Sequence, residues 1–248
     1  MVGKLILRGL IVGIVAGLLA FGYAKVFGEP HVAVAIHLEG VHEEAERAAI
    51  VAAGKTPPPE EPEMFSRDVQ TGVGLLTGMV GVGAGIGVLF GVLFAFANGR
   101  MGSLGPKATA GLLGLMGLVT AYVVPALKYP ANPPTVGSPE TIKLRTGLYF
   151  LMIALSLIAT LFGLFLRGRL VSRLGAWSAS VVAGLVYIAL LFVIFYQLPV
   201  INEVPSDFPA PTLWSFRIAS LGIQTVLWGS VALLFGYFNG LPNTSDER

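Results

Sequence analysis

The sequence predicts an all-α membrane protein with six transmembrane helices. Six apolar runs each reach about 20 residues, the length of helix that crosses the roughly 30 Å hydrocarbon core of a bilayer. In composition, 54% of the residues are hydrophobic and only 12% are charged, against about a quarter in soluble domains. Because a backbone in lipid must satisfy its own hydrogen bonds, each run is expected to be a helix. The expected spans are 5–27, 72–97, 107–127, 146–166, 176–198 and 218–238.

Six spans and their connections use nearly all of the 248 residues, so we expect one polytopic membrane domain over 1–248. The spans should form three hairpins, in which long outward segments alternate with short inward turns. Prolines in the second and third outward segments prevent continuous helix there and stiffen the backbone. They favour a formed vestibule, with ordinary interfacial loops as the alternative. The first run also resembles a signal peptide, but its length favours a retained span.

The charges of the connecting segments predict the orientation. If the helices alternate, the N-terminus, the two short turns and the C-terminal tail share one side, with eight basic residues against Asp246 and Glu247. The other side holds eight basic and twelve acidic residues. The eight basic residues of the first side, Arg248 among them, are much more densely spaced than those of the other side, and cytoplasmic segments are enriched in Lys and Arg. We therefore expect a multi-pass protein of the cytoplasmic (inner) membrane with both termini in the cytoplasm.

Glycines recur at four-residue spacing in the first two spans. Small residues at this spacing lie on one helix face and let two helix backbones approach closely. We expect these two helices to pack tightly, against each other or against a partner helix, with a glycine-lined conduit as the alternative. The positions are Gly9, Gly13 and Gly17 in the first span and Gly83, Gly87 and Gly91 in the second.

A candidate metal site lies in the first outward segment, 28–71, which holds all three histidines. If the stretch after Ile36 is helical, acidic and imidazole side chains share one face at positions i, i+3, i+4 and i+7. Imidazole and carboxylate together suit divalent first-row metals such as Co²⁺, Ni²⁺, Mn²⁺ or Zn²⁺. A merely solvated face is the alternative, because no sharp ligand motif is present. The face comprises Glu39, His42, Glu43 and Glu46, and the predicted capture site comprises His37, Glu39, His42 and Glu43.

Polar residues at the outward ends of the helices form a second candidate set. Ionisable groups at membrane depth are costly and tend to mark ion or substrate paths. Pro125 is expected to interrupt the third helix, and a broken helix beside neutral oxygen donors would let a cation shed water. The alternatives are an ordinary kink, and basic side chains that snorkel or pair with carboxylates. The predicted transport path comprises Asn202, Glu203, Asp207, Lys128, Asn132, Arg217 and Gln224.

Other classes of function have little support in the sequence. The chain has no cysteine, which excludes disulfides and thiolate metal sites. The closely spaced glycines of the second span lie inside that span and not between a strand and a helix, so they do not form a phosphate loop. No stretch of basic residues interleaved with aromatics suggests nucleic-acid binding. We expect no enzyme activity, no permanently bound cofactor and no nucleic-acid partner.

Three segments carry a family resemblance: "FGEPHVAVAIHLEG", "LKYPANPPTVGSPETIKLRTGLYFLMIALSL" and "LPVINEVPSDFPAPTLWSFRIASLGIQTVLW". They resemble the hallmark segments of the CbtA family of cobalt transporter subunits, from near the N-terminus to the last span. The matching positions are Glu29, Pro30 and Glu39, then Lys128, Tyr129, Pro130, Asn132, Pro133 and Pro134, then Asn202, Glu203, Pro205, Asp207, Phe208, Pro209 and Arg217.

The resemblance implies uptake of Co²⁺ linked to cobalamin synthesis, with Ni²⁺ or another divalent metal as the alternative cargo. It also implies a small single-span partner subunit of CbtB type. The lipid bilayer is the other expected partner, and a homo-oligomer is a further candidate. The family is often described with five spans, one fewer than the runs counted here. The rival hypothesis is a non-transporting scaffold or accessory subunit that docks a partner through its outer loops.

In the transport hypothesis the two candidate sets act in succession. The capture residues collect the ion outside, and Asn202, Glu203 and Asp207 receive it at the mouth of the helix bundle. Arg217 and Lys128 set the local charge.

Overall fold

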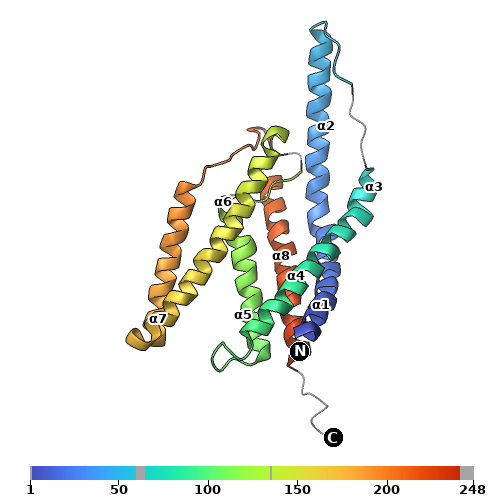
Figure 1. Cartoon of the computed structure of the whole chain (residues 1–248). Helices are drawn as coiled ribbons and strands as arrows, with labels where there is room; N and C mark the ends of the chain where they lie inside the picture. Colours follow the sequence, from blue (N-terminus) through green and yellow to red (C-terminus); the bar gives the residue numbers. More distant parts are fainter. Residues whose placement is uncertain (1, 60–64, 135, 241–248) are drawn as a thin grey trace. The chain divides into compact units, whose positions relative to one another are not determined.

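A computed structural model describes the whole chain except residues 1, 60–64, 135 and 241–248. Asp246, Glu247 and Arg248, which entered the predicted orientation, therefore lie outside the described residues. The described residues form helices and no strand (Figure 1). The predicted all-α class is thus confirmed for this part of the chain.

Within the described residues, five helices are long and apolar enough to cross a membrane: Val2–Ala52, Arg67–Ala97, Pro106–Lys128, Pro139–Gln197 and Ala210–Asn239. In order, their segments are α1 (Val2–Tyr23), η1 (Ala24–Gly28), α2 (Glu29–Ala52), α3 (Arg67–Val69), η2 (Gln70–Gly74), α4 (Leu75–Ala97), α5 (Pro106–Leu118), η3 (Val119–Val123), α6 (Val124–Lys128), η4 (Pro139–Thr141), α7 (Ile142–Gln197) and α8 (Ala210–Asn239).

The count of five differs from the predicted six because α7 contains two of the predicted spans. Gly175 breaks its helical geometry with φ 76° and ψ 166°, a backbone conformation that glycine adopts at little cost. Figure 1 shows α7 as two arms that meet at a sharp bend. The second arm, residues 176–197, has a length of about 33 Å at 1.5 Å per residue, enough to cross a bilayer.

The first helix continues far beyond the predicted end of its span at residue 27. Val2–Ala52 is one helical run of 51 residues, so the first outward segment begins as a helix and not as a loop. Glu29–Ala52 is rich in Ala and Glu, which are strong helix formers. The stretch after Ile36 is therefore helical, as the predicted capture face requires.

Two prolines lie within continuous helices, each just after a π-helical segment. Pro30 follows η1 and Pro125 follows η3. In these segments the hydrogen bonds span five residues, as from the Glu29 N–H to the Ala24 carbonyl. A proline cannot donate a bond to the preceding turn and crowds its carbonyl, and the wider π turn relieves both effects. The prediction that Pro125 interrupts its helix is therefore wrong, because Pro106–Lys128 stays helical throughout.

The chain divides into two compact units. Unit 1 comprises Met1–Met116, Asn132–Val136 and Asp207–Arg248, and unit 2 comprises Gly117–Ala131 and Gly137–Ser206. The single membrane domain predicted over 1–248 and its three consecutive hairpins stay predictions.

Unit 1 is built on a backbone contact between α1 and α4. A Cβ added at Gly9 would overlap the Gly87 carbonyl, and one added at Gly13 would overlap the Gly83 carbonyl. Such close approach replaces side-chain packing with dispersion and weak Cα–H···O contacts. The predicted tight packing of the first two spans is confirmed, with the two glycine faces against each other.

Helix α8 completes the core of unit 1. Phe235 packs edge-on against Phe90 and Phe94 of α4, with ring centroids 5.3 and 5.0 Å apart. On α5, Gly114 lies directly against Ala232 of α8. All three phenylalanines are almost fully buried, which makes them the largest apolar contribution to this interior.

Unit 2 consists mainly of the α7 hairpin. Near the bend, the Arg167 Nε donates to the Ser180 Oγ at 2.9 Å and joins the two arms. Further along the arms, Gly163 packs against Tyr187. A Cβ added at Gly163 would lie 3.7 Å from the Tyr187 Cβ. The segments η3 and α6 also pack on α7 within this unit.

The α1–α4 contact predicts that substitutions at two nearby glycines of α4 have very different effects on thermal stability. Gly87→Leu should push α1 and α4 apart, whereas the exposed Gly85 has nothing within 4 Å of its would-be Cβ. We expect Gly87→Leu to cost at least the ~1–3 kcal/mol typical of overpacking. The melting temperature in detergent should fall by about 2–4 °C per kcal/mol. Gly85→Leu should melt like the wild type, and equal melting of both variants would contradict the backbone contact.

Candidate functional site

The predicted capture residues lie on α2 in unit 1. The helix is formed, so Glu39, His42 and Glu43 share the expected face, and all three are exposed. His37 is also exposed, two residues before Glu39. Among the residues that the structure describes, no three His, Asp or Glu side chains lie close enough to hold a metal ion. The face therefore presents metal-ligand side chains without a completed chelate.

One residue from each predicted set meets in unit 1. The His42 Nε2 lies 3.2 Å from the Asp207 Oδ2, just before α8 begins, and the two side chains are 56% and 62% exposed. Exposed pairs of this kind stabilise a fold by only about 0–1 kcal/mol. The contact is therefore weak enough to exchange for another partner at little cost in stability.

Glu39 has an altered protonation equilibrium. Although the residue is exposed overall, neighbouring atoms partly desolvate its carboxyl group and raise its pKa above the usual range, and the negative charge of Glu43 one turn away raises the pKa further. Both effects disfavour the charged carboxylate. A cation beside Glu39 and Glu43 would relieve their repulsion and compete with the proton.

Two contacts hold the beginning of α2 against the region before α4. The Arg67 Nη2 lies 2.7 Å from the Glu29 Oε2, and the Lys25 Nζ donates to the Thr71 carbonyl at 3.1 Å. Glu29 matched the family pattern in sequence and Arg67 precedes the second span, but nothing in their spacing revealed that they pair. Because Glu29 is mostly buried, this pair is better shielded from water than the His42–Asp207 contact.

The third histidine lines a pocket of about 250 Å³ in unit 1. His31 lies there with the aromatic rings of Tyr23 and Phe27 and with residues of the first turns of α8, including Trp214 and Ser215. Tyr23 and Phe27 also contact each other, with ring centroids 4.6 Å apart. No local pattern in the sequence links His31 with α8, because His31 and Trp214 are about 180 residues apart in the chain.

Glu203 is the centre of a polar cluster in unit 2. Its Oε2 accepts hydrogen bonds from the Thr141 Oγ1 and the Ser138 N–H, both at 2.9 Å, and lies 3.4 Å from the Arg145 Nε. The Arg145 Nη2 in turn donates to the Ser138 carbonyl at 3.1 Å. The hydrogen bonds from Thr141 and Ser138, and then the charge of Arg145, hold the pKa of Glu203 below its usual range. This carboxylate joins the two proline-rich segments of unit 2.

Lys128 and Tyr129 hold the C-terminal end of α7. The Lys128 Nζ donates to the Phe195 carbonyl at 2.7 Å, and the Tyr129 Oη donates to the Pro199 carbonyl at 2.9 Å. Carbonyls in the last turn of a helix have no partner within the helix, and a cation there also interacts favourably with the helix dipole. Lys128 therefore has a structural role in addition to any role in a transport path.

The remaining path residues divide between the units. In unit 1 the Arg217 Nη2 donates to the Asn132 Oδ1 at 2.9 Å, and Gln224 is half-buried on α8. In unit 2 Asn202 is exposed beside Glu203. The structure thus joins His42 with Asp207 and Arg217 with Asn132, and it surrounds Glu203 with residues outside the predicted set.

The lowered pKa of Glu203 predicts a pH-dependent contribution to stability. A carboxyl whose pKa is lower in the folded state stabilises the fold above its unfolded pKa, near 4.3, and loses this effect as pH falls through the folded pKa. We expect Glu203→Gln to lower the melting temperature at pH 7 and to melt like the wild type in strong acid. Glu140→Gln, at an exposed neighbouring carboxylate, is the matched control. A melting difference that is independent of pH would contradict the charged cluster.

Comparison with known proteins gives one match. Neither a curated protein nor a solved structure matches the chain. The family model described as "Probable cobalt transporter subunit (CbtA)" matches residues 2–240, nearly the whole chain. Together with the apolar helices and the polar groups at their ends, this match identifies the chain as a member of the CbtA family of membrane proteins.

Proposed function

We propose that the chain carries Co²⁺ inward across the cytoplasmic membrane, as the multi-pass subunit of an uptake system that supplies cobalamin synthesis. Membership of a family described as cobalt transporter subunits supports cobalt as the cargo. Ni²⁺ or another divalent first-row metal is the alternative cargo, because imidazole and carboxylate ligands suit several of these ions. The cargo binds transiently, and no permanently bound cofactor is part of the proposal.

The observation that carries the proposal is the contact between His42 and Asp207. The His42 imidazole nitrogen and the Asp207 carboxylate oxygen are 3.2 Å apart, so the two side chains could each give one ligand to the same metal ion. Both side chains are exposed to water. Glu39 and Glu43 lie on the same helix face and add negative charge around this pair, and His37 precedes Glu39 by two residues. Two protein ligands leave most coordination positions to water, which suits a site that must release its ion.

The other polar residues have distinct roles in the proposal. Glu203 stays anionic, because its hydrogen bonds and Arg145 favour the charged form, and with Asn202 it attracts the cation. Arg217 and Lys128 fix positive charge near the path. Asn132 holds Arg217 through its Oδ1, and Gln224 offers a neutral oxygen. Fixed charges at the end of a helix bundle raise the local concentration of oppositely charged ions.

We propose that the chain crosses the membrane six times, with each arm of α7 as one crossing and both termini in the cytoplasm. The length of each arm supports this count, and the density of Lys and Arg at the termini and short turns supports the orientation. The working complex contains a small single-span subunit of CbtB type, with a homo-oligomer as the alternative assembly.

A scaffold without transport activity is the second candidate function. The absence of a group of three metal-ligand side chains among the described residues favours it. So does the Glu203 cluster, because a carboxylate that joins two loops would preserve a fixed surface for a partner protein. Direct measurement of cobalt uptake separates the two candidates.

Substitution of the paired residues tests the transport hypothesis. We expect His42→Ala or Asp207→Asn to raise the half-saturating Co²⁺ concentration about tenfold, which corresponds to ~1.4 kcal/mol of lost binding free energy. Uptake of radioactive cobalt into cells or vesicles that contain the chain and its partner measures this. Glu44→Gln, on α2 but outside both candidate sets, should leave uptake unchanged. Cobalt uptake that is equal in all variants would exclude this pair from the path. If the wild-type chain gave no cobalt uptake, the scaffold hypothesis would be favoured.

Labelling of single cysteines tests the orientation, because the natural chain has none. In intact cells, a membrane-impermeant maleimide should label Val41→Cys on α2. It should reach Ser103→Cys and Ala176→Cys only after lysis, because Ser103 lies in one proposed cytoplasmic turn and Ala176 directly follows the other, at the start of the second arm of α7. Each position is exposed. Labelling of Ala176→Cys in intact cells would show that the arms of α7 do not cross as proposed.

A further inference from the structure

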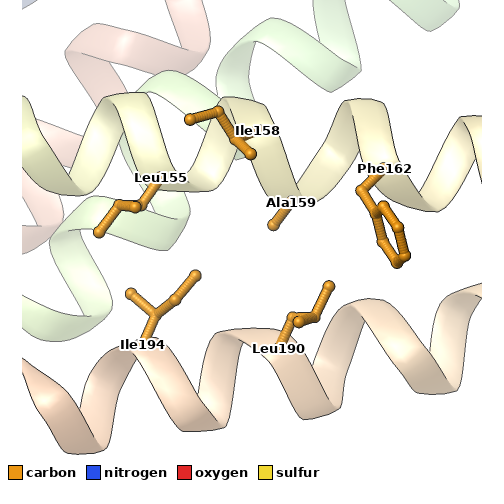
Figure 2. Close-up of a pocket in the computed structure, with 6 residues that line it drawn as sticks. All are labelled: Leu155, Ile158, Ala159, Phe162, Leu190 and Ile194. Atoms are coloured by element: carbon orange, nitrogen blue, oxygen red, sulfur yellow. The ribbon is translucent and has the colours of Figure 1, made fainter.

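A groove without polar side chains runs between the two arms of α7 in unit 2. It has a volume of about 260 Å³. Figure 2 shows its lining side chains extending from the two arms toward the space between them. The first arm supplies most of the lining and the second arm supplies the rest: Leu155, Ile158, Ala159 and Phe162, then Leu190 and Ile194.

The spacing of these residues is that of a helix-packing site. The four residues of the first arm are at i, i+3, i+4 and i+7, the arrangement that forms a hole for one side chain of a facing helix. Leu190 and Ile194 are one turn apart on the second arm. Ala159 is the small member of the set and is almost fully buried, so it forms the floor, while the larger side chains form the rim. A third helix lying across both arms would place a side chain in this hole.

The α7 hairpin is also the least covered of the apolar helices. Only 11% of its most apolar window is buried, compared with 28–33% in each of the other four. Large side chains such as Ile158, Leu185 and Phe192 are at least half exposed. Lipid tails are as apolar as these side chains, so the hydrophobic effect alone does not drive coverage by protein. A helix whose side chains fill the groove gains dispersion contacts that a mobile lipid tail makes less completely.

We propose that this groove binds one apolar transmembrane helix of another polypeptide, the partner that the description "subunit" implies. The proposal rests on the subunit role of the chain and not on cobalt as its cargo. A second copy of this chain fits less well. A two-fold dimer places the same patch of both copies face to face, and two opposed grooves leave a void between them.

Photo-cross-linking tests the proposal at two positions of equal depth. In the membranes of the source cell, Leu190 or Phe192 is replaced by p-benzoylphenylalanine. The two positions are about 200° apart on the helix, so Leu190 lines the groove and the 70% exposed Phe192 does not. Mass spectrometry identifies the attached peptide. We expect the Leu190 probe to attach to an apolar span of a different polypeptide, and the Phe192 probe to attach to lipid.

A groove-filling variant shows whether the attachment depends on the groove. Ile194→Trp, combined with the Leu190 probe, should lower the cross-linking yield about tenfold, the effect of ~1.4 kcal/mol of lost association. Val193→Trp, at an exposed adjacent position outside the groove, should leave the yield unchanged. An equal yield in both tryptophan variants would overturn the proposal.

Three other products at the Leu190 probe would also overturn it. Attachment to lipid alone would make the groove a lipid site. Attachment within the chain would mean that the chain covers its own groove, and a product of twice 26.1 kDa would indicate a second copy. None of these readouts requires cobalt, so failure of this proposal is distinguishable from failure of the transport hypothesis.

Discussion

The close contact of α1 with α4 is the constraint on which unit 1 depends. Two faces of glycine bring the backbones so near that a single added methyl group at Gly9 or Gly13 would overlap a carbonyl. In lipid, where apolar side chains gain nothing by leaving the solvent, such surface complementarity is a main source of helix association. The contact also fixes the base of the helix that continues into α2. The positions of His31 and His42 relative to α8 therefore follow from glycines well inside the apolar run.

The carboxylates at the predicted outward ends of the helices are stabilised locally. Glu29 pairs with Arg67, Asp207 contacts His42, and Glu203 binds Thr141, Ser138 and Arg145. Glu29 and Glu203 are much less exposed than Asp207, so the three contacts differ in how readily water or an ion can replace the partner. Shielded pairs keep the loops in place, and the exposed pair is the one that an incoming ion can reach. Asp207 is therefore the carboxylate that we propose to contact the ion directly, whereas Glu203 acts on it through its charge.

Much of the fold was predictable from the sequence, because membrane helices depend on local composition. The apolar runs predicted the helices, and the four-residue spacing of Gly83 and Gly87 predicted the face of α4 that packs on α1. The continuation of the first helix through Pro30 was missed, since a proline normally marks a boundary and the π turn that accommodates it has no clear sequence signal. The site was less predictable. His42 and Asp207 were both named, but their contact joins segments 165 residues apart in the chain, and no local pattern encodes such a pairing.

Because the helix runs without a break from Val2 to Ala52, α2 is a continuous extension of α1, and a change in its direction moves its far end. The hydrogen bonding of this helix departs from the α-helical pattern at η1, just before Pro30. His42 lies twelve residues beyond that proline, about 18 Å along the axis at 1.5 Å per residue. A tilt of roughly 10° at η1 would thus displace His42 by about 3 Å, comparable to its separation of 3.2 Å from Asp207. A small rotation at η1 would therefore make or break an imidazole–carboxylate contact that lies roughly four helical turns further along the helix.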